Sequence, residues 1–398
     1  MPLSHPRRFA LLASVTVTFL AAASAPTPLY PRYQAEWALS SLDVTVIFGV
    51  YAVAVLASLL VFGRLSDHLG RRPVLLASLA VQVLAMAGFA LAGGFAGMLV
   101  ARVVQGLATG AAVAAVGAGL LDIDRARGTV TNSVVVPIGT ATGGLVAGLV
   151  VSTLPAPGQL IYALLAVIFV LQFASVALMK ETIAPQADAR TAALASLRPQ
   201  FSVSAATRAP LLRATPIIVA TWAVPGFFGS LGPALMHGVL GLEASLASGL
   251  LMFTLAGSAG LSVVLSHRFG PQQLTTLGAL SLGVGLPLLT LGLSLPSIAL
   301  FFIGASIAGL GFGSGFQGAL RSVLAHASPH ERAGVLSVVF VIAYLAMGAP
   351  AMIAGWLVAI DGNLLRTSLE FAALILVLAA LALAGVAVRP ARTRSTPA

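Results

Sequence analysis

Twelve long apolar stretches dominate the 398-residue sequence, and no other feature limits its possible folds as strongly. Each is close to the roughly 20 residues that a helix needs to cross the hydrocarbon core of a bilayer. Runs such as 372–388 show no alternation of apolar and polar residues, which excludes transmembrane strands. The sequence therefore predicts an all-α membrane protein with twelve transmembrane helices. The expected spans are 9–29, 41–62, 74–93, 95–121, 129–153, 159–179, 214–236, 245–266, 273–293, 297–320, 334–358 and 367–388.

Charged residues are too scarce for a water-soluble protein. Only 8% of the residues are Asp, Glu, Lys or Arg, against about a quarter in soluble domains. This composition excludes a soluble enzyme, a nucleic-acid-binding protein, a disordered protein and a fibrous protein. The sequence contains no Cys, so it has no disulfide and no cysteine-based metal site.

The distribution of Lys and Arg predicts the orientation in the membrane. With the N-terminus in the cytoplasm, all of these residues fall on cytoplasmic segments except Arg32, Arg366 and Arg102. This bias follows the positive-inside rule, so we expect both termini in the cytoplasm and the protein in the cytoplasmic (inner) membrane. In an alternative, Ala23-Ser24-Ala25 is the cleavage site of a signal peptide, which would leave eleven helices.

A polar, basic segment near the middle divides the chain into two halves of six predicted helices. Leu65-Ser66 and Gly70 after the second span recur as Leu265-Ser266 and Gly270 after the eighth, a weak internal repeat. Two similar halves predict two pseudo-symmetric six-helix bundles, as in duplicated transporters with the substrate site between the halves. The expected segments are an N-terminal bundle at 1–180, a cytoplasmic central loop at 181–213, a C-terminal bundle at 214–388 and a basic cytoplasmic tail at 389–398.

The loop between the second and third spans carries the most specific motif. It reads Gly63-Arg64-Leu65-Ser66-Asp67-His68-Leu69-Gly70-Arg71-Arg72-Pro73. This resembles the signature G-x-L-a-D-r-x-G-r-r of the major facilitator superfamily, in the loop where that signature is expected. The resemblance covers the whole chain, because the twelve spans and the central loop also fit. It implies a monomeric secondary transporter that works by alternating access, with a small-molecule substrate and no cofactor.

Two further segments resemble motifs of the twelve-helix drug/proton antiporter branch of that family. They are Arg102-Val103-Val104-Gln105-Gly106 for R-x-x-Q-G and Gly139-Thr140-Ala141-Thr142-Gly143-Gly144 for G-P-x-x-G-G with Thr in place of Pro. After the sixth span, Lys180-Glu181-Thr182 resembles a P-E-T tripeptide common at that place, with Lys in place of Pro. The resemblance implies proton-coupled efflux of small organic compounds. Gly139, Gly143 and Gly144 are expected to allow close packing and bending of the fifth span.

The resemblance also implies a gating latch at the cytoplasmic face. Asp67 is expected to dock at the start of the eleventh span when that face is closed, and Arg71 to be shared with Asp122. The segment Ser328-Pro329-His330-Glu331 predicts a capping box with proline at the first helical position, whose free N–H groups attract an anion. The alternative is a solvated Asp67 that only caps the third span. The predicted latch residues are Gly63, Asp67, Gly70, Arg71, Arg72, Asp122, Ser328 and Glu331.

Arg102 is the one basic residue well inside a predicted span. An intramembrane Arg usually faces a cavity or a partner, and Asp43 is the acidic residue of the N-terminal half best placed to pair with it. We predict that Arg102 and Asp43 tune a proton-coupling step, because a nearby cation changes the pKa of a carboxyl group. The alternatives are that Arg102 snorkels to the surface and that Asp43 is a helix cap.

A substrate pocket is expected between the halves. A mostly apolar pocket suits a moderately hydrophobic organic molecule. No acidic residue lies deep in a predicted span, which disfavours a metal ion or a strongly cationic substrate. Proline residues in the first and seventh spans, such as Pro28 and Pro225, predict bends suited to gating. The candidate substrate-binding residues are Tyr30, Gln105, Trp222, Phe227, Gln317 and Tyr344.

Other functions fit the sequence less well. A uniporter or an importer of a sugar-like metabolite is the alternative on the same fold. A membrane enzyme lacks a convergent set of acid, base or metal-binding residues, and His326 and His330 lack the H-E-x-x-H order of a zinc site. A channel lacks a repeated pore element. The expected partners are thus the substrate, protons and the lipid bilayer, with no nucleic acid and no metal.

Overall fold

The computed structural model describes residues 5–183, 189–266 and 268–387, and every regular element in this part of the chain is a helix. Twelve spans are long and apolar enough to cross a membrane, with α1, η1 and α2 counted as one. The predictions of an all-α fold and of twelve spans are confirmed. The elements are α1 His5–Ser24, η1 Thr27–Leu29, α2 Tyr30–Trp37, α3 Ser41–Phe62, α4 Leu65–Leu69, α5 Arg71–Leu91, α6 Phe95–Ile123, α7 Arg125–Thr153, α8 Pro157–Ala177, α9 Ala189–Ser196, α10 Ala205–Gly238, α11 Ala244–Leu265, α12 Pro271–Ser294, α13 Ile298–Leu324, α14 Arg332–Asp361 and α15 Leu364–Ala387.

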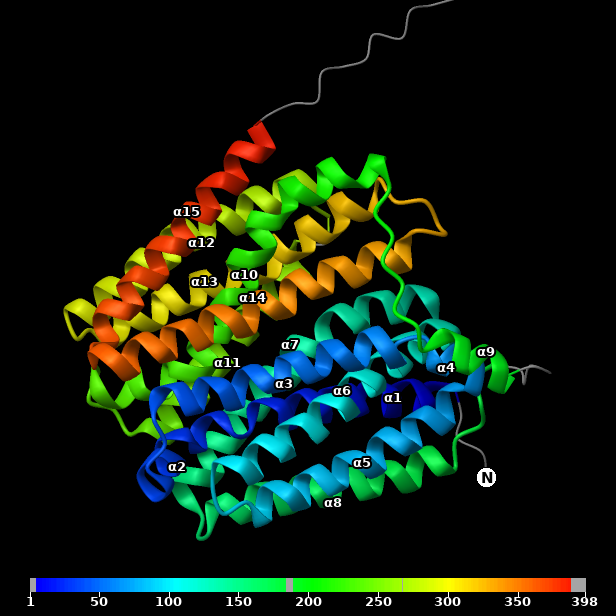
Figure 1. Ribbon diagram of the computed structural model, residues 1–398, viewed down its shortest axis with the longest axis horizontal. Coiled ribbons are helices and arrows are strands. Elements are labelled where there is room, and N and C mark those ends of the chain that lie inside the picture. The colour runs from blue at the N-terminus through cyan, green and yellow to red at the C-terminus, as the bar shows by residue number, and fades with distance from the viewer. Residues whose placement is uncertain (1–4, 184–188, 267, 388–398) are drawn as a thin grey trace, which may run out of the picture.

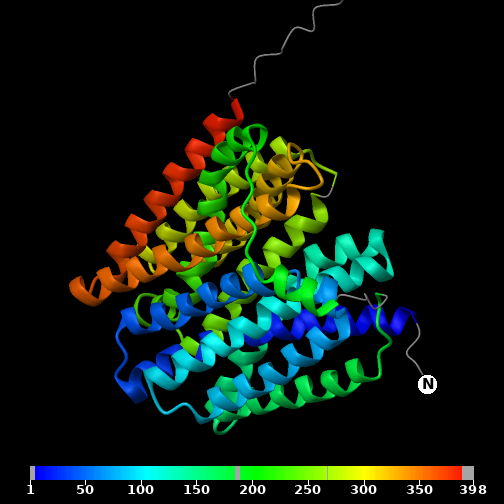
Figure 2. The ribbon, with the colours of Figure 1, turned by 45° about the vertical axis from the view of Figure 1, so that its right-hand side comes forward.

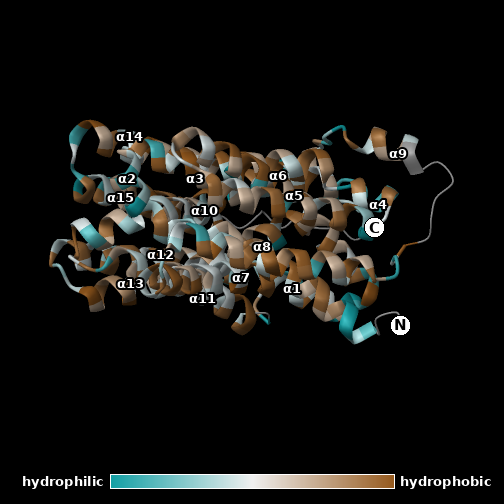
Figure 3. Ribbon diagram, turned by 90° about the horizontal axis from the view of Figure 1, so that it is seen from below, coloured by the Kyte–Doolittle hydropathy of each residue, from teal (hydrophilic) through white to brown (hydrophobic). Residues whose placement is uncertain are grey.

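The long helices run side by side and form two bundles (Figure 1). Helices α1 to α8 form one bundle and α10 to α15 the other, and the wider space between their ribbons is seen in Figure 2. The beginning of α1, α4 and α9 lie at one end of the molecule and α2 at the other; we call these the α9 end and the α2 end. Hydrophobic residues dominate along the helices and hydrophilic residues gather mostly at their ends (Figure 3). This pattern is the one expected for helices that cross a bilayer.

Short polar caps fix where several helices begin and end. Ser40 and Asp43 form a capping box at the start of α3, in which the Asp43 backbone N–H donates to Ser40 Oγ over 3.1 Å. Asp124 accepts from the Arg127 N–H at the start of α7, and Glu243 accepts from two N–H groups at the start of α11. These side chains satisfy N–H groups that have no partner within the helix. Gly362, with φ of 66°, ends α14.

Two features of the helices differ from the expectation. The central loop is partly helical, because α9 lies within it and α10 begins at Ala205 rather than near residue 214. The first span is interrupted after Ser24 by η1, as its prolines predict, whereas α10 continues through Pro225 and Pro233. The predicted tail at 389–398 lies outside the described residues.

Each bundle buries its own apolar core. One core gathers residues from Leu12 to Met179 and the other from Leu211 to Ala382. Large fully buried side chains such as Phe19 and Phe169 pack edge to face within the first core, with ring centroids 5.0 Å apart. Two separate cores allow the bundles to move against each other as units.

The bundles touch through α7 with α11 and α3 with α14. At the α2 end these contacts are close: a Cβ added to Gly148 would lie 2.8 Å from Ser245 O, and one added to Gly49 would lie 3.1 Å from Met352 Sδ. Thr27 Oγ1 also donates to Gly229 O across the bundles, over 3.2 Å. The structure therefore shows the bundles joined at the α2 end.

Candidate functional site

A cluster of charged residues surrounds the start of α5 at the α9 end. The Arg71 guanidinium is buried, donates to Asp122 Oδ2 over 3.0 Å through Nε, and donates to Asp67 and Ser66 through one terminal nitrogen. The structure thus brings Asp67, Arg71 and Asp122 together. Buried charges need such partners, because desolvation penalises an unpaired ion.

Glu181, which follows α8, holds the first turn of α5. Its two carboxylate oxygens accept from the backbone N–H groups of Arg71 and Arg72, over 2.9 and 3.0 Å. Gly70 has a φ of +101°, a conformation that L side chains rarely adopt, and an added Cβ would collide with the Glu181 carboxylate. Glu181 is therefore part of the charged cluster, and only its place in a tripeptide motif pointed to it in the sequence.

The start of α14 differs from the prediction. The helix begins at Arg332, with Glu331 as its N-cap, so Pro329 lies in the preceding turn and not at the first helical position. Half of the expected capping box is present, because the Ser328 N–H donates to Glu331 Oε2 over 3.3 Å. In the described part of the chain no hydrogen bond or ion pair joins Asp67 to Ser328 or Glu331.

The central loop contacts both bundles at the α9 end. Helix α9 packs against α4, the short helix that carries Asp67. Further along, Ser202 lies against the first turn of α14, where a Cβ added to Gly334 would be 2.6 Å from the Ser202 backbone nitrogen. In this structure the position at which Asp67 is expected to dock is therefore next to the central loop.

Arg102 lies in the interior of the first bundle and is fully buried. Its guanidinium donates to Ala23 O at 2.9 Å, Gln105 Oε1 at 2.8 Å and Tyr30 Oη at 2.6 Å. The rings of Tyr51 and Phe89 lie below the charge, with centroids 5.2 and 5.8 Å from Cζ. All these partners are neutral, and cation–π contact contributes where no carboxylate does.

Asp43 does not reach Arg102. Its carboxylate accepts instead from the backbone N–H and hydroxyl of Ser40, over 2.8 and 2.7 Å, at the first turn of α3. Among the described ion pairs none includes Arg102 or Asp43. The expected pairing is therefore wrong for this structure, since a carboxylate that closes a capping box cannot also extend into the interior.

The two antiporter-like motifs meet on one stretch of α1. Gln105 Nε2 donates to Ala22 O over 2.9 Å, next to the carbonyl that Arg102 binds. From the other side, a Cβ added to Gly139 would lie 2.6 Å from Val17 O, and one added to Gly143 would collide with the Ala21 backbone. Gly144 instead faces Met252 of α11. Helices α6 and α7 thus both contact the last turns of α1, directly before that helix ends at Ser24.

Aromatic side chains gather where α10, α13 and α14 meet. The Trp222 ring lies 5.0 Å from Tyr344, 5.2 Å from Phe316 and 6.1 Å from Phe312, measured between ring centroids. We call these four residues the Trp222 cluster. Trp222 Nε1 and, on α13, Gln317 Oε1 are buried without a hydrogen-bond partner in the described structure. Trp222 and Tyr344 thus meet in one cluster, whereas Gln317 is placed only by its position after Phe316 in the chain.

The remaining predicted substrate-binding residues lie elsewhere. Tyr30 and Gln105 are fully buried and bind Arg102 in the first bundle. Phe227 stacks on Phe371 of α15, 4.1 Å between centroids, within the core of the second bundle. The assignment of Phe227 to the pocket is therefore wrong: helix α10 is apolar on every face, so the sequence did not reveal which face it packs. Tyr51 of α3 and Phe312 and Phe316 of α13 were missed because those helices are also apolar on all sides.

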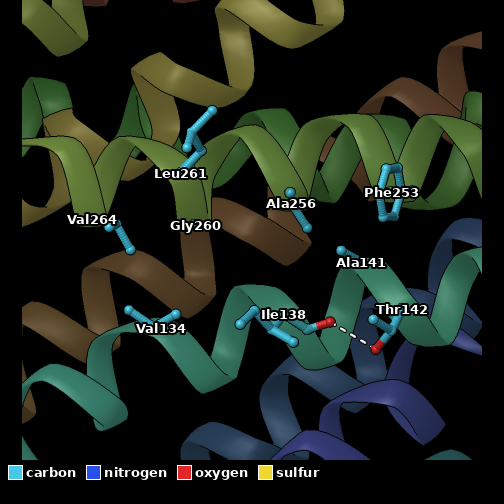
Figure 4. A pocket seen from close by; sticks show the side chains of 10 residues that line it. Val134, Ile138, Ala141, Thr142, Phe253, Ala256, Gly260, Leu261 and Val264 are labelled. Atoms are coloured by element: carbon cyan, nitrogen blue, oxygen red, sulfur yellow. Dashed lines mark hydrogen bonds between the residues drawn. The ribbon is translucent and has the colours of Figure 1, made fainter.

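Two hollows lie between the bundles. One, of about 280 Å³, is an apolar groove between α7 and α11, where Ile138 and Ala141 face Phe253, Gly260 and other residues of the partner helix (Figure 4). Its one hydroxyl, on Thr142, donates to Ile138 O over 2.8 Å. The other, of about 630 Å³, opens at the α2 end between α2 and the α10–α11 connection and includes Gln34, His237 and Glu243.

Comparison with known proteins gives one family match. The sequence profile described as Major Facilitator Superfamily matches residues 12–348. No curated protein sequence matches the chain.

Several solved structures share the fold. A bacterial homologue of the human lysosomal transporter Spinster, in an inward-facing and occupied conformation, is 13% identical with a TM-score of 0.76, over 95% of this chain and 96% of that chain. The nucleoside transporter NupG is 13% identical with a TM-score of 0.70, over 96% and 99% of the two chains. The human organic anion transporter MFSD10 is 19% identical with a TM-score of 0.64, over 96% and 100%. At these identities the likeness shows the fold alone.

Proposed function

The chain belongs to the Major Facilitator Superfamily, and from that premise we propose that it is a proton-coupled exporter of moderately hydrophobic organic molecules. The family is one of transporters, so its membership makes the chain a transporter. The finer assignment, to the drug/proton antiporter kind, depends on the geometry of the motifs.

The convergence of both antiporter-like motifs on α1 carries this proposal. Arg102 donates to the Ala23 carbonyl and Gln105 to the Ala22 carbonyl, and Gly139 and Gly143 pack on the turns just before them. A change in the hydration or protonation of this region would strengthen or weaken the hydrogen bonds that α6 makes to the end of α1. Such a change would be transmitted to η1, which contacts the second bundle through Thr27.

Alternating access supplies the mechanism. In this structure the bundles are joined at the α2 end, and we propose that the α9 end faces the cytoplasm, where substrate enters. The other state would join the α9 end, with Asp67 at the start of α14, and open the α2 end. In this proposal the protein works as a monomer in the cytoplasmic membrane, with both termini in the cytoplasm.

Proton movement in proteoliposomes tests the proposal. Pyranine trapped inside reports internal pH while neutral, anionic and cationic aromatic compounds are added under an imposed pH gradient. We expect at least one compound to cause proton flux that needs the protein and that is reduced at least about tenfold in Arg102→Gln, because loss of the guanidinium removes charge-assisted bonds to α1.

Two outcomes would contradict the proposal. Compound movement without proton flux would favour the uniporter, and accumulation inside the cell would favour the importer. Asp43→Asn separates the roles of the two residues predicted from the sequence. A coupling role predicts that it reduces driven transport more than exchange, whereas the capping box in the structure predicts equal and small effects on both.

A further inference from the structure

The positive charge of Arg102 is not neutralised by a carboxylate. Its hydrogen bonds within the described structure reach a backbone carbonyl, an amide and a phenol, and its Nε atom is buried with no partner among the described residues. Charges interact strongly in a medium of low dielectric, and an uncompensated cation leaves a positive potential around it.

No described acidic residue opposes this potential from the middle of the spans. Glu370, six residues into α15, is the furthest from a helix end, and it already pairs with Arg366 over 2.8 Å. Asp188 lies outside the described residues. The other described acidic residues, at helix ends or in connections, are Glu36, Asp43, Asp67, Asp122, Asp124, Glu181, Glu243, Glu331 and Asp361.

Tyr51 links Arg102 to the Trp222 cluster. Its ring lies 5.2 Å from Arg102 Cζ on one side. Tyr51 lies on α3 and Tyr344 on α14, and these two helices pack against each other across the bundles. A Cβ added to Gly348, one turn after Tyr344, would lie 3.6 Å from Gly49 and 3.9 Å from the Ala52 side chain, next to Tyr51 in the chain. The helix that carries Tyr344 therefore lies beside the helix whose Tyr51 contacts the Arg102 cation.

The Trp222 cluster is a group of aromatic rings with one unused hydrogen-bond donor. An indole N–H can only donate, and when buried it usually has a partner. Here Trp222 Nε1 is buried and has none in the described structure. Its partner would have to be a hydrogen-bond acceptor, and the strongest acceptors are anionic oxygens.

From these observations we infer that the preferred substrates are aromatic compounds with an anionic group such as a carboxylate. In this proposal the aromatic ring packs against the Trp222 cluster, and the carboxylate accepts from Trp222 Nε1 within the positive potential of Arg102. This inference rests on the proposed transport function and names its substrate class. A cationic ring of the same size meets the same surface with the unfavourable sign of charge.

Three naphthalene compounds with one ring system and different charges test the inference. They are 2-naphthoate, neutral 2-naphthamide and the 2-naphthylmethylammonium cation. Binding to the full chain in detergent is followed by Trp222 fluorescence in a Trp37→Phe/Trp356→Phe background, in which Trp222 is the only tryptophan. We expect the dissociation constant of naphthoate to be about tenfold below that of naphthamide, with the cation weakest.

Variants identify the source of the preference. Arg102→Gln should abolish the ratio between naphthoate and naphthamide, and Arg102→Lys should retain most of it because the charge remains. Arg366→Gln, at an exposed Arg outside the interior, is the matched control and should leave the ratio unchanged. If Arg102→Gln does not fold, Trp222→Phe measured by calorimetry should weaken naphthoate about tenfold.

The inference is overturned if the three compounds bind equally, if the ratio survives in Arg102→Gln, or if none of them quenches Trp222. Because the assay measures binding in detergent, these results do not depend on proton flux. Anion-selective binding without proton flux in proteoliposomes would instead contradict the proposed coupling and leave the substrate class in place.

Discussion

Asp67 has one set of partners in this structure and is proposed to acquire another. Here it is an acceptor for Arg71, with about half of its side chain exposed, at 48%. An ion pair with that exposure contributes about 1 kcal/mol or less to stability. Docking at the start of α14, in contrast, would place the carboxylate against free N–H groups that favour an anion.

Asp67→Asn should therefore separate stability from transport. We expect the thermal midpoint and substrate binding to change little, and turnover to fall about tenfold because the second state loses its anion. Purified protein in proteoliposomes gives turnover, and a thermal-shift assay gives stability. Asp124→Asn, which alters a cap at the same end of the molecule, is the control. Turnover equal to that of the unmodified chain would remove Asp67 from the gating mechanism.

At the scale of single residues, the sequence predicted the contact between Arg71 and Asp122, which lie at the same ends of two neighbouring helices, but not the partners of Arg102. Asp67, Arg71 and Asp122 flank two neighbouring helices, so short connections bring them together. Arg102 and Asp43 lie on different helices, and local capping by Ser40 held Asp43 at the surface. Local hydrogen bonds compete with long-range ones, and a distant pairing cannot be read from spacing alone.

At the scale of helices, α7 packs on α1 through surfaces that have no side chains. Gly143→Val should prevent this contact, because even a Cβ atom would collide with the Ala21 backbone. We expect loss of folded protein or a fall of about 3 kcal/mol in stability, the range for overpacking a close contact. Gly283→Ala is the control: nothing lies within 4 Å of its added Cβ, so it should be neutral or slightly stabilising. Equal size-exclusion profiles and melting temperatures for the two variants would contradict this account of α7.

The number of spans and the approximate position of most of them could be predicted, but the orientation of the helices about their own axes could not. Length and hydropathy set the spans, and the bilayer demands them. In a soluble helix an apolar stripe marks the buried face. In α10 the lipid-facing and buried sides are equally apolar, so Phe227 and Trp222 looked alike although one faces α15 and the other faces α13 and α14.

At the scale of the whole molecule, the orientation in the membrane remains a prediction. Because the chain has no Cys, single cysteines report it without interference. We expect Ala195→Cys, exposed on α9, to react with an impermeant maleimide only after cells are permeabilised. Gln159→Cys, exposed at the α2 end, should react in intact cells. The reverse pattern would place the α9 end outside and overturn the proposed direction of export.

The seam at the α2 end has a mechanical consequence. Gly49, Gly148 and their neighbours form it mainly from backbone and apolar groups, which can slide past one another without breaking strong bonds. Few strong bonds must break as the bundles rock, and resistance then comes from the lipid that each bundle displaces. Turnover should therefore depend on the hydrophobic thickness of the surrounding bilayer. Reconstitution into phosphatidylcholines of increasing acyl-chain length would show this as a graded change in rate, whereas a rate indifferent to the lipid would mean that internal bonds control the motion.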